Sequence, residues 1–190
     1  MKSIYNVLFV FMLTIGTTYG QAGLQLYAGT SNAMNRDASI TPQGQSHTGY
    51  HFGLDARLNE GKMFFGGGLE YSSINFVAKQ NKSYFSVDHP MTWFKIRIGL
   101  GYKLIDITDK INIRAKTYGS INMITKYPED MIDVPYTRYN SGTAAGVIGL
   151  GMDIHSLTLD FEYERGFFNA VHLVKGTEID FYKLSLGFRI

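Results

Sequence analysis

The 190-residue sequence contains no cysteine, only four prolines and a single tryptophan. The absence of cysteine excludes a disulfide scaffold, a thiolate-bound zinc ion, an iron–sulfur cluster and cysteine catalysis. Neither charge sign dominates: 18 lysines and arginines stand against 16 aspartates and glutamates, which excludes a dedicated nucleic-acid-binding protein. After the first 20 residues, no apolar run approaches the ~18 residues that a membrane-spanning helix needs.

The first 20 residues have the layout of a secretory signal peptide. Lys2 supplies a positive start, residues 7–13 form an unbroken apolar run, and the small residues Thr18 and Gly20 precede a cleavage point before Gln21. This apolar run is too short to cross a bilayer as a helix. We therefore expect a cleaved signal peptide at 1–20 and an exported domain at 21–190, with cleavage after Ala22 as the alternative.

The exported domain is rich in residues that favour strands, since the chain has 13 tyrosines, 13 phenylalanines and 21 glycines. Apolar and polar residues alternate strictly in several segments, as in Phe94, Ile96 and Ile98 against Lys95 and Arg97. Such a period of two indicates half-buried strands. We predict eight of them, at 22–31, 50–58, 63–75, 92–104, 111–123, 142–154, 157–164 and 182–190.

The connections between these segments alternate in length. Three are short turns, at 59–62, 106–110 and 155–156. The others are long polar stretches, at 32–46, 77–90, 125–141 and 166–176. Transmembrane β-barrels show this asymmetry, with tight turns at one end and long loops at the other. We therefore predict an all-β fold: an eight-stranded antiparallel up-and-down transmembrane β-barrel.

Alternation alone does not say which face points outward. A soluble barrel of lipocalin type would turn its apolar face inward around a ligand, whereas a membrane barrel turns it toward lipid. The polar faces carry full charges of both signs in mid-strand, which a narrow lumen requires to be paired, and they also collect small glycines. These features favour the membrane arrangement. The predicted lumen network comprises Asp55, Arg57, Glu70, Lys95, Arg97, Arg114, Lys116, Asp160, Glu162, Glu164, Lys183 and Arg189.

The signal peptide, the eight strands and the closing segment resemble small bacterial outer-membrane β-barrels of the OmpA and OmpX type, including the porin-like outer membrane protein β-barrel domain family. The resemblance covers about 22–190. It implies a place in the outer membrane of a Gram-negative cell envelope, with the lipid bilayer and the barrel-assembly machinery as partners. In that family the closing strand is the signal for assembly, although its usual last residue is Phe. The corresponding residues here are Tyr182, Leu184, Leu186, Phe188 and Ile190.

The candidate reactive clusters do not predict catalysis or metal binding. Four histidines are placed at the loop end, but they come from three separate connections and lack the spacing of metal ligands, so we interpret them as loop and girdle residues: His47, His51, His89 and His172. His155 and Ser156 lie in a predicted turn, away from Glu162 in the lumen. The acidic run from Asp153 to Glu164 is best explained by pairing with lumen cations. We predict no catalytic residue, cofactor or metal.

Aromatic residues predict two interfacial girdles, as in membrane barrels. One girdle, toward the loops, comprises Tyr50, Phe76, Trp93 and Phe94, and the other, toward the turns, comprises Phe64, Phe65, Tyr102 and Phe188. The stretch 125–141, rich in tyrosine and charge, is the first candidate for contact with an unknown extracellular partner.

We therefore expect an outer-membrane barrel with a structural or interaction role, either in envelope integrity or in loop-mediated recognition, and with a plugged lumen that conducts poorly. Three alternatives stay open: an outer-leaflet lipid-modifying enzyme, a narrow passive pore, and a soluble lipocalin-like ligand binder.

Overall fold

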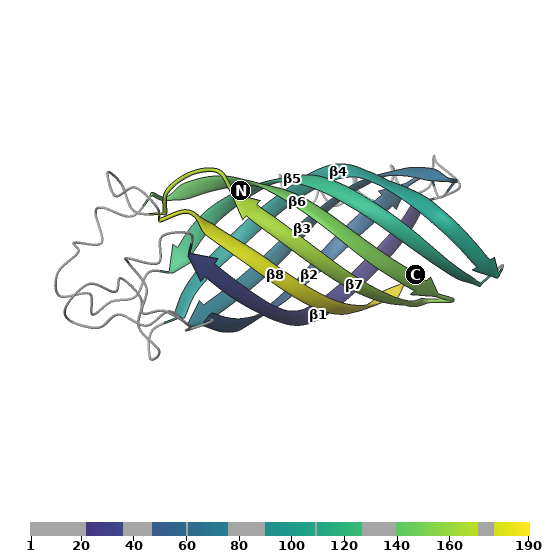
Figure 1. The fold of residues 1–190 in the computed structure, drawn as a ribbon, viewed down its shortest axis with the longest axis horizontal. Coiled ribbons are helices and arrows are strands. Elements are labelled where there is room, and N and C mark those ends of the chain that lie inside the picture. Colours follow the sequence, from purple (N-terminus) through teal and green to yellow (C-terminus); the bar gives the residue numbers. More distant parts are fainter. Residues whose placement is uncertain are drawn as a thin grey trace, which may run out of the picture.

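The computed structural model describes residues 22–35, 47–59, 61–75, 90–108, 110–126, 140–170 and 177–190. They form eight strands that close into one barrel, each pairing with the next in sequence, and β1 with β8 (Figure 1). Every pairing is antiparallel, so the predicted fold is confirmed. The strands are β1 (Ala22–Asn35), β2 (His47–Leu58), β3 (Met63–Asn75), β4 (Pro90–Thr108), β5 (Ile111–Lys126), β6 (Gly142–Ile154), β7 (Leu157–Gly166) and β8 (Ile179–Arg189). The predicted signal peptide at 1–20 lies outside the described residues.

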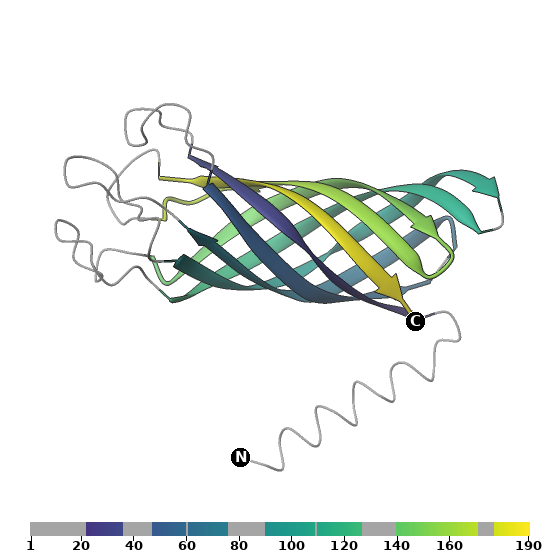
Figure 2. The same ribbon diagram turned by 90° about the horizontal axis from the view of Figure 1, so that it is seen from below.

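The first and last strands lie side by side and close the barrel (Figure 2). Tight turns join β2 to β3, β4 to β5 and β6 to β7, and we call this end of the barrel the turn end and the opposite one the loop end. No helix long and apolar enough to cross a bilayer occurs in the part of the chain that the structure describes.

Several strands are longer than the alternation predicted, and β4 is the clearest case. It runs for 19 residues instead of spanning 92–104. Its pairing with β3 reaches only Met63–Tyr102, but β4 continues against β5 to the Thr108–Ile111 pair. Register shifts after Lys103 and after Asp106 interrupt the alternation there, which is why the sequence pattern ended early.

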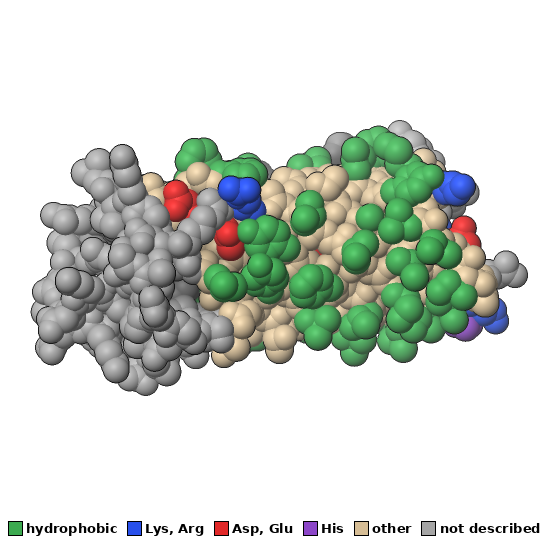
Figure 3. Space-filling view, in the orientation of Figure 1, with side chains coloured by type: hydrophobic (Ala, Val, Ile, Leu, Met, Phe, Trp, Pro, Cys, Tyr) green, Lys and Arg blue, Asp and Glu red, His purple; other side chains and the backbone are tan. Residues whose placement is uncertain are grey.

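The apolar face of the strands is the outer surface of the barrel. Ile98 and Leu186 are 75% and 62% exposed, whereas Arg97 and Glu162 are each 2% exposed. Figure 3 shows hydrophobic side chains spread over the middle of one face, with charged side chains only toward its ends. The side chains of the closing segment share this outward orientation, being 41% to 73% exposed: Tyr182, Leu184, Leu186, Phe188 and Ile190.

Two residues predicted for the girdles lie inside the barrel instead. Trp93 is 2% exposed and Phe64 is 1% exposed, so their assignment to the girdles is wrong. The reason is their phase, because Trp93 lies on the same face of its strand as the inward-pointing Lys95, and Phe64 on the same face as Gly66. Among the other girdle residues, the exposed ones are Tyr50, Phe65, Tyr102 and Phe188, Phe94 is half-buried, and Phe76 lies outside the described residues.

Glycines on the inner face make room for aromatic rings. A Cβ atom on Gly66 would lie 2.3 Å from the Oη of Tyr118, and one on Gly101 would lie 2.0 Å from the Phe64 ring. Real Cβ atoms do not approach other atoms so closely, so a side chain at either position would force the neighbouring ring to move. Small residues allow an eight-stranded barrel, whose interior is just wide enough for side chains, to hold large ones.

Candidate functional site

The candidate site is the barrel lumen, into which alternate residues of all eight strands point. The residues predicted for the lumen network lie there, and eleven of them are at most 7% exposed. The twelfth, Arg189, lies near the turn end with 20% of its side chain exposed. Charges so poorly hydrated are tolerated only when they are paired and hydrogen-bonded.

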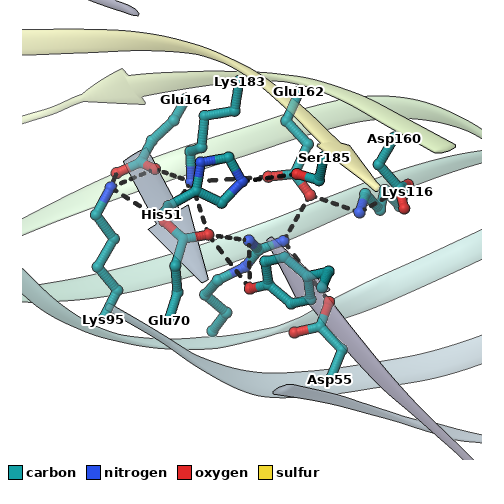
Figure 4. Close-up of polar contacts among 12 residues, drawn as sticks. His51, Asp55, Glu70, Lys95, Lys116, Asp160, Glu162, Glu164, Lys183 and Ser185 are labelled. Atoms are coloured by element: carbon teal, nitrogen blue, oxygen red, sulfur yellow. Dashed lines mark hydrogen bonds and ion pairs between the residues drawn. The ribbon is translucent and has the colours of Figure 1, made fainter. Parts of the chain in front are cut away.

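The half of the network nearer the loops is organised around Glu70, a residue of β3 that is fully buried (Figure 4). Its carboxylate lies 2.8 Å from the Nζ of Lys183, 2.6 Å from an Nη of Arg97 and 3.5 Å from the Nζ of Lys95. The two lysines also hold Glu164 of β7, at 2.8 Å from Lys95 and 2.7 Å from Lys183. Two carboxylates and three cations therefore share one site, contributed by four strands.

The half nearer the turns has two aspartates. Asp160 of β7 accepts a hydrogen bond of 2.5 Å from Arg114 and lies 2.9 Å from the Nζ of Lys116. Asp153 of β6 begins the acidic run that was expected to pair with lumen cations, although it was not among the twelve predicted network residues. It is contacted by Arg114 and Arg57 at 2.9 Å each and by Arg189 at 3.4 Å. Asp153 is in phase with the inward-pointing Gly149 and Gly151, which explains its place in the lumen.

Glu162 joins the two halves into one network. Its carboxylate lies 2.5 Å from the Nζ of Lys116 and 2.7 Å from an Nη of Arg97. The chain of ion pairs therefore runs from Asp153 near the turn end to Glu164 toward the loop end. The fully buried members comprise six acids and six bases, so their formal charges cancel. The acids are Asp55, Glu70, Asp153, Asp160, Glu162 and Glu164, and the bases are Arg57, Lys95, Arg97, Arg114, Lys116 and Lys183.

Asp55 is the most weakly paired of the predicted residues. The shortest distance from its carboxylate to a guanidinium nitrogen of Arg97 is 3.9 Å, too long for a hydrogen bond. The two residues are separated by Gly68, the register partner of both. The structure therefore brings Asp55 beside the network without fixing it as firmly as the other acids.

Uncharged side chains complete the network, and the sequence analysis missed them. The hydroxyl of Tyr27 donates to Glu70 at 3.3 Å and accepts from Arg97 at 3.2 Å. The amide of Gln25 donates to Thr158 at 2.7 Å and to Asp160 at 3.2 Å. Both residues lie on β1, where the alternation was too diluted by small residues to assign a face.

An apolar layer closes the lumen above the network, toward the loop end. We call it the loop-end layer, and it comprises Ile74, Met91, Trp93, Ile124, Ile179 and Phe181, all at most 8% exposed. Trp93 and Phe181 meet edge to face with 5.5 Å between ring centroids, and the Nζ of Lys95 lies 4.0 Å from the centroid of Phe181. This layer separates the charges from the loop end of the barrel.

At the other end, Phe64 packs beneath the guanidinium of Arg57, whose Cζ lies 5.2 Å from the ring centroid. Arg57 also donates to the side-chain oxygen of Gln25 and to Asp153. Aromatic and ion-pair contacts therefore cover the network at both ends of the lumen.

The histidine predictions are partly overturned. His51 is not a loop or girdle residue, because it is 1% exposed in the lumen, with its Nδ1 and Nε2 each 2.7 Å from a serine hydroxyl, of Ser31 and Ser185. It points inward in phase with Asp55 and Arg57. His89, His172 and the side chain of His47 lie outside the described residues. The described residues contain no group of three or more His, Asp or Glu side chains that would hold a metal ion.

The structure does not bring the other suspected cluster together. His155 is an exposed turn residue with a φ of 55°, and Ser156 follows it in the same turn. Glu162 is buried in the lumen among cations. These three residues therefore do not form a catalytic triad.

The closed barrel, the apolar exterior and the charged lumen define the class of fold, that of a small eight-stranded outer-membrane β-barrel. No protein-family model and no curated protein matches the sequence. Among solved structures, the chain is similar to Neisserial surface protein A (NspA), with 15% identity over 89% of this chain and 96% of that chain and a TM-score of 0.53. It is also similar to the outer membrane enzyme PagL, with 10% identity over 88% of this chain and 99% of that chain and a TM-score of 0.57. These likenesses confirm the predicted resemblance at the level of the fold.

Proposed function

We propose that the protein is an integral outer-membrane barrel with a structural or interaction role, in envelope integrity or in recognition through its loops. The observation that carries this proposal is the combination of an apolar exterior with a lumen of paired charges. Such a molecule is held in lipid by its outer face and held rigid by its interior. The similarity in fold to surface and outer-membrane proteins supports the location.

The interior argues against the pore and the lipocalin alternatives. A ligand-binding barrel of lipocalin type needs an apolar cavity, but here the side chains of Arg97, Lys183 and Glu162 occupy the centre of the lumen. A passive pore needs a hydrated path, whereas the network is almost inaccessible to water and the loop-end layer lies across it. We propose that the barrel does not conduct ions.

We also propose that the protein is not an enzyme. PagL, one of the similar structures, is named an enzyme, which keeps the enzymatic alternative in view. A lipid-modifying enzyme, however, must present its nucleophile to the membrane. The serine–histidine contacts that the described residues provide, from His51 to Ser31 and Ser185, are buried in the lumen, where lipid does not reach them.

For biogenesis, we propose that the barrel-assembly machinery inserts the chain by recognising β8. The alternation of outward residues along that strand, from Tyr182 to Phe188, supports this proposal. The stretch proposed for an extracellular partner, 125–141, falls mostly outside the described residues, so recognition through it stays a prediction.

Cell fractionation combined with gel electrophoresis tests the location. We expect the protein in the outer-membrane fraction, with a compact band in unboiled samples that shifts to the full-length position after boiling. Planar-bilayer recordings of the purified barrel test the closed lumen, and we expect no stable conductance. A single periplasmic band would contradict the location, and a steady open current would contradict the plugged lumen.

A further inference from the structure

His51 links three strands where the barrel closes. Gly29 of β1 is the register partner of both His51 on β2 and Ser185 on β8. Because Gly29 has no side chain, the imidazole of His51 reaches across β1 to the Ser185 hydroxyl, 2.7 Å from its Nε2 (Figure 4). Its Nδ1 lies 2.7 Å from the hydroxyl of Ser31 on β1. The ring therefore ties the last strand to the first two.

The bonds of His51 suit a neutral ring. With one nitrogen protonated, the imidazole donates to one serine and accepts from the other. A second proton would make both nitrogens donors, so the serine that had donated would have to turn its hydroxyl away. The ring is 1% exposed, so water does not hydrate the added charge.

The charged groups around His51 leave it no counter-ion. The charged side chains that act on the ring electrostatically are Glu70 on β3, Lys95 on β4, Glu162 on β7 and Lys183 on β8. The ring of Tyr27 on β1 lies 6.0 Å from that of His51, measured between centroids. The two carboxylates are already held by lysine and arginine side chains. No carboxylate of the described residues forms an ion pair with the ring, so a protonated His51 would add an unpaired cation to a balanced lumen.

We infer that His51 is an acid-sensitive latch. While its imidazole is neutral, it ties β1, β2 and β8 together through Ser31 and Ser185, and when it gains a proton these contacts between the strands loosen. In the unfolded chain, water hydrates the protonated ring, which forms as the pH falls through ~6.5. In the folded barrel, the same proton would break a serine hydrogen bond and would not be hydrated. The latch therefore contributes its full stability at neutral pH and loses it as the pH falls below this value.

Urea unfolding of the purified, lipid-reconstituted barrel between pH 7.5 and 5.0 tests the latch with two variants. His51→Gln keeps a donor and an acceptor but does not ionise, and His155→Gln makes the same change in an exposed turn. We expect the unfolding constant of the unaltered protein to rise by up to ~10-fold per pH unit below pH ~6.5, relative to His51→Gln. His155→Gln should follow the unaltered protein. Equal pH dependence of the unaltered protein and His51→Gln would overturn the inference.

Nuclear magnetic resonance of the unaltered barrel tests the same inference without a variant. The ring signals of His51 should stay those of a neutral imidazole down to pH 5.0 for as long as the barrel stays folded. A ring that takes up its proton near pH ~6.5, with the barrel signals unchanged, would overturn the latch.

Discussion

The inner and outer faces of the same strand are held by different forces. Neighbouring residues of β4 show the contrast, since Ile98 is 75% exposed on the outer face and Arg97 is 2% exposed in the lumen. Ile98 is set beside register partners that are both glycines, Gly67 and Gly119. Arg97 lies within 2.7 Å of two carboxylates, those of Glu70 and Glu162.

The two faces should tolerate substitutions differently. An outer side chain interacts mainly with the surrounding lipid, so a substitution there changes only the free energy of transferring that side chain into lipid. An inner side chain is one of several partners in a network, and its loss leaves the others buried and uncompensated. The outer face should therefore accept any apolar residue, whereas the inner face should accept few changes of any kind.

Arg97→Met should give the largest effect. The substitution leaves Glu70 and Glu162 short of a cation in a dry lumen, and breaking a buried pair in this way costs about 3–5 kcal/mol of unfolding free energy. Ile98→Leu, one position along the strand, is the control and should change little. Urea unfolding in liposomes measures both, and similar effects for the two variants would contradict the contrast between the faces.

Ile98→Lys tests the outer face with a charge instead. A lysine on the lipid side of a barrel near the middle of the bilayer costs about 2–4 kcal/mol, falling to about 0–1 kcal/mol near the interfaces. Ile107→Lys on the same strand, close to the turn end, should therefore be nearly neutral. The same liposome assay gives both values. If the two lysines have equal effects, the outer face does not meet a bilayer.

Gly66→Ala and Gly119→Ala repeat the comparison with one methyl group. In the lumen, the new Cβ at Gly66 would lie 2.3 Å from the hydroxyl oxygen of Tyr118, whereas at Gly119, on the outer face, its nearest neighbour would be 3.9 Å away. Forcing an extra methyl group into a packed interior costs about 1–3 kcal/mol. We expect a loss of that size for Gly66→Ala and almost none for Gly119→Ala in the same unfolding assay.

The sequence was sufficient for the architecture because alternation depends only on which face a residue occupies. It failed where both faces are apolar, as at Trp93, which we assigned to a girdle although it shares its phase with Lys95. There the inner face changes from the charged network to the loop-end layer, and hydrophobicity no longer separates inside from outside. At the other end of β4, the register shifts interrupt the alternation, so the predicted strand ended at 104 although β4 continues to Thr108.

The partners within the lumen were beyond the reach of the sequence. Lys95 and Glu164 are 69 positions apart and lie on β4 and β7, strands that are not neighbours in the barrel. Their contact depends on the stagger between strands, which sets the height of every residue, and on the width of the lumen. A list of charged positions does not contain either quantity. For the same reason, His51 was placed among the loops.

Arg189→Gln should have the smallest effect and marks where the inner face ends. Arg189 is 20% exposed by side chain and lies 3.4 Å from Asp153, which keeps Arg57 and Arg114 as closer partners. A partly hydrated pair of this kind contributes about 0–1 kcal/mol and is screened by salt. Arg114→Gln, which removes a fully buried partner of the same aspartate, should cost several times more at any salt concentration. Unfolding of both variants at low and high salt distinguishes them, because only the loss at Arg189 should fade as the ionic strength rises. A salt-independent loss at Arg189 would extend the water-excluded network to the edge of the barrel.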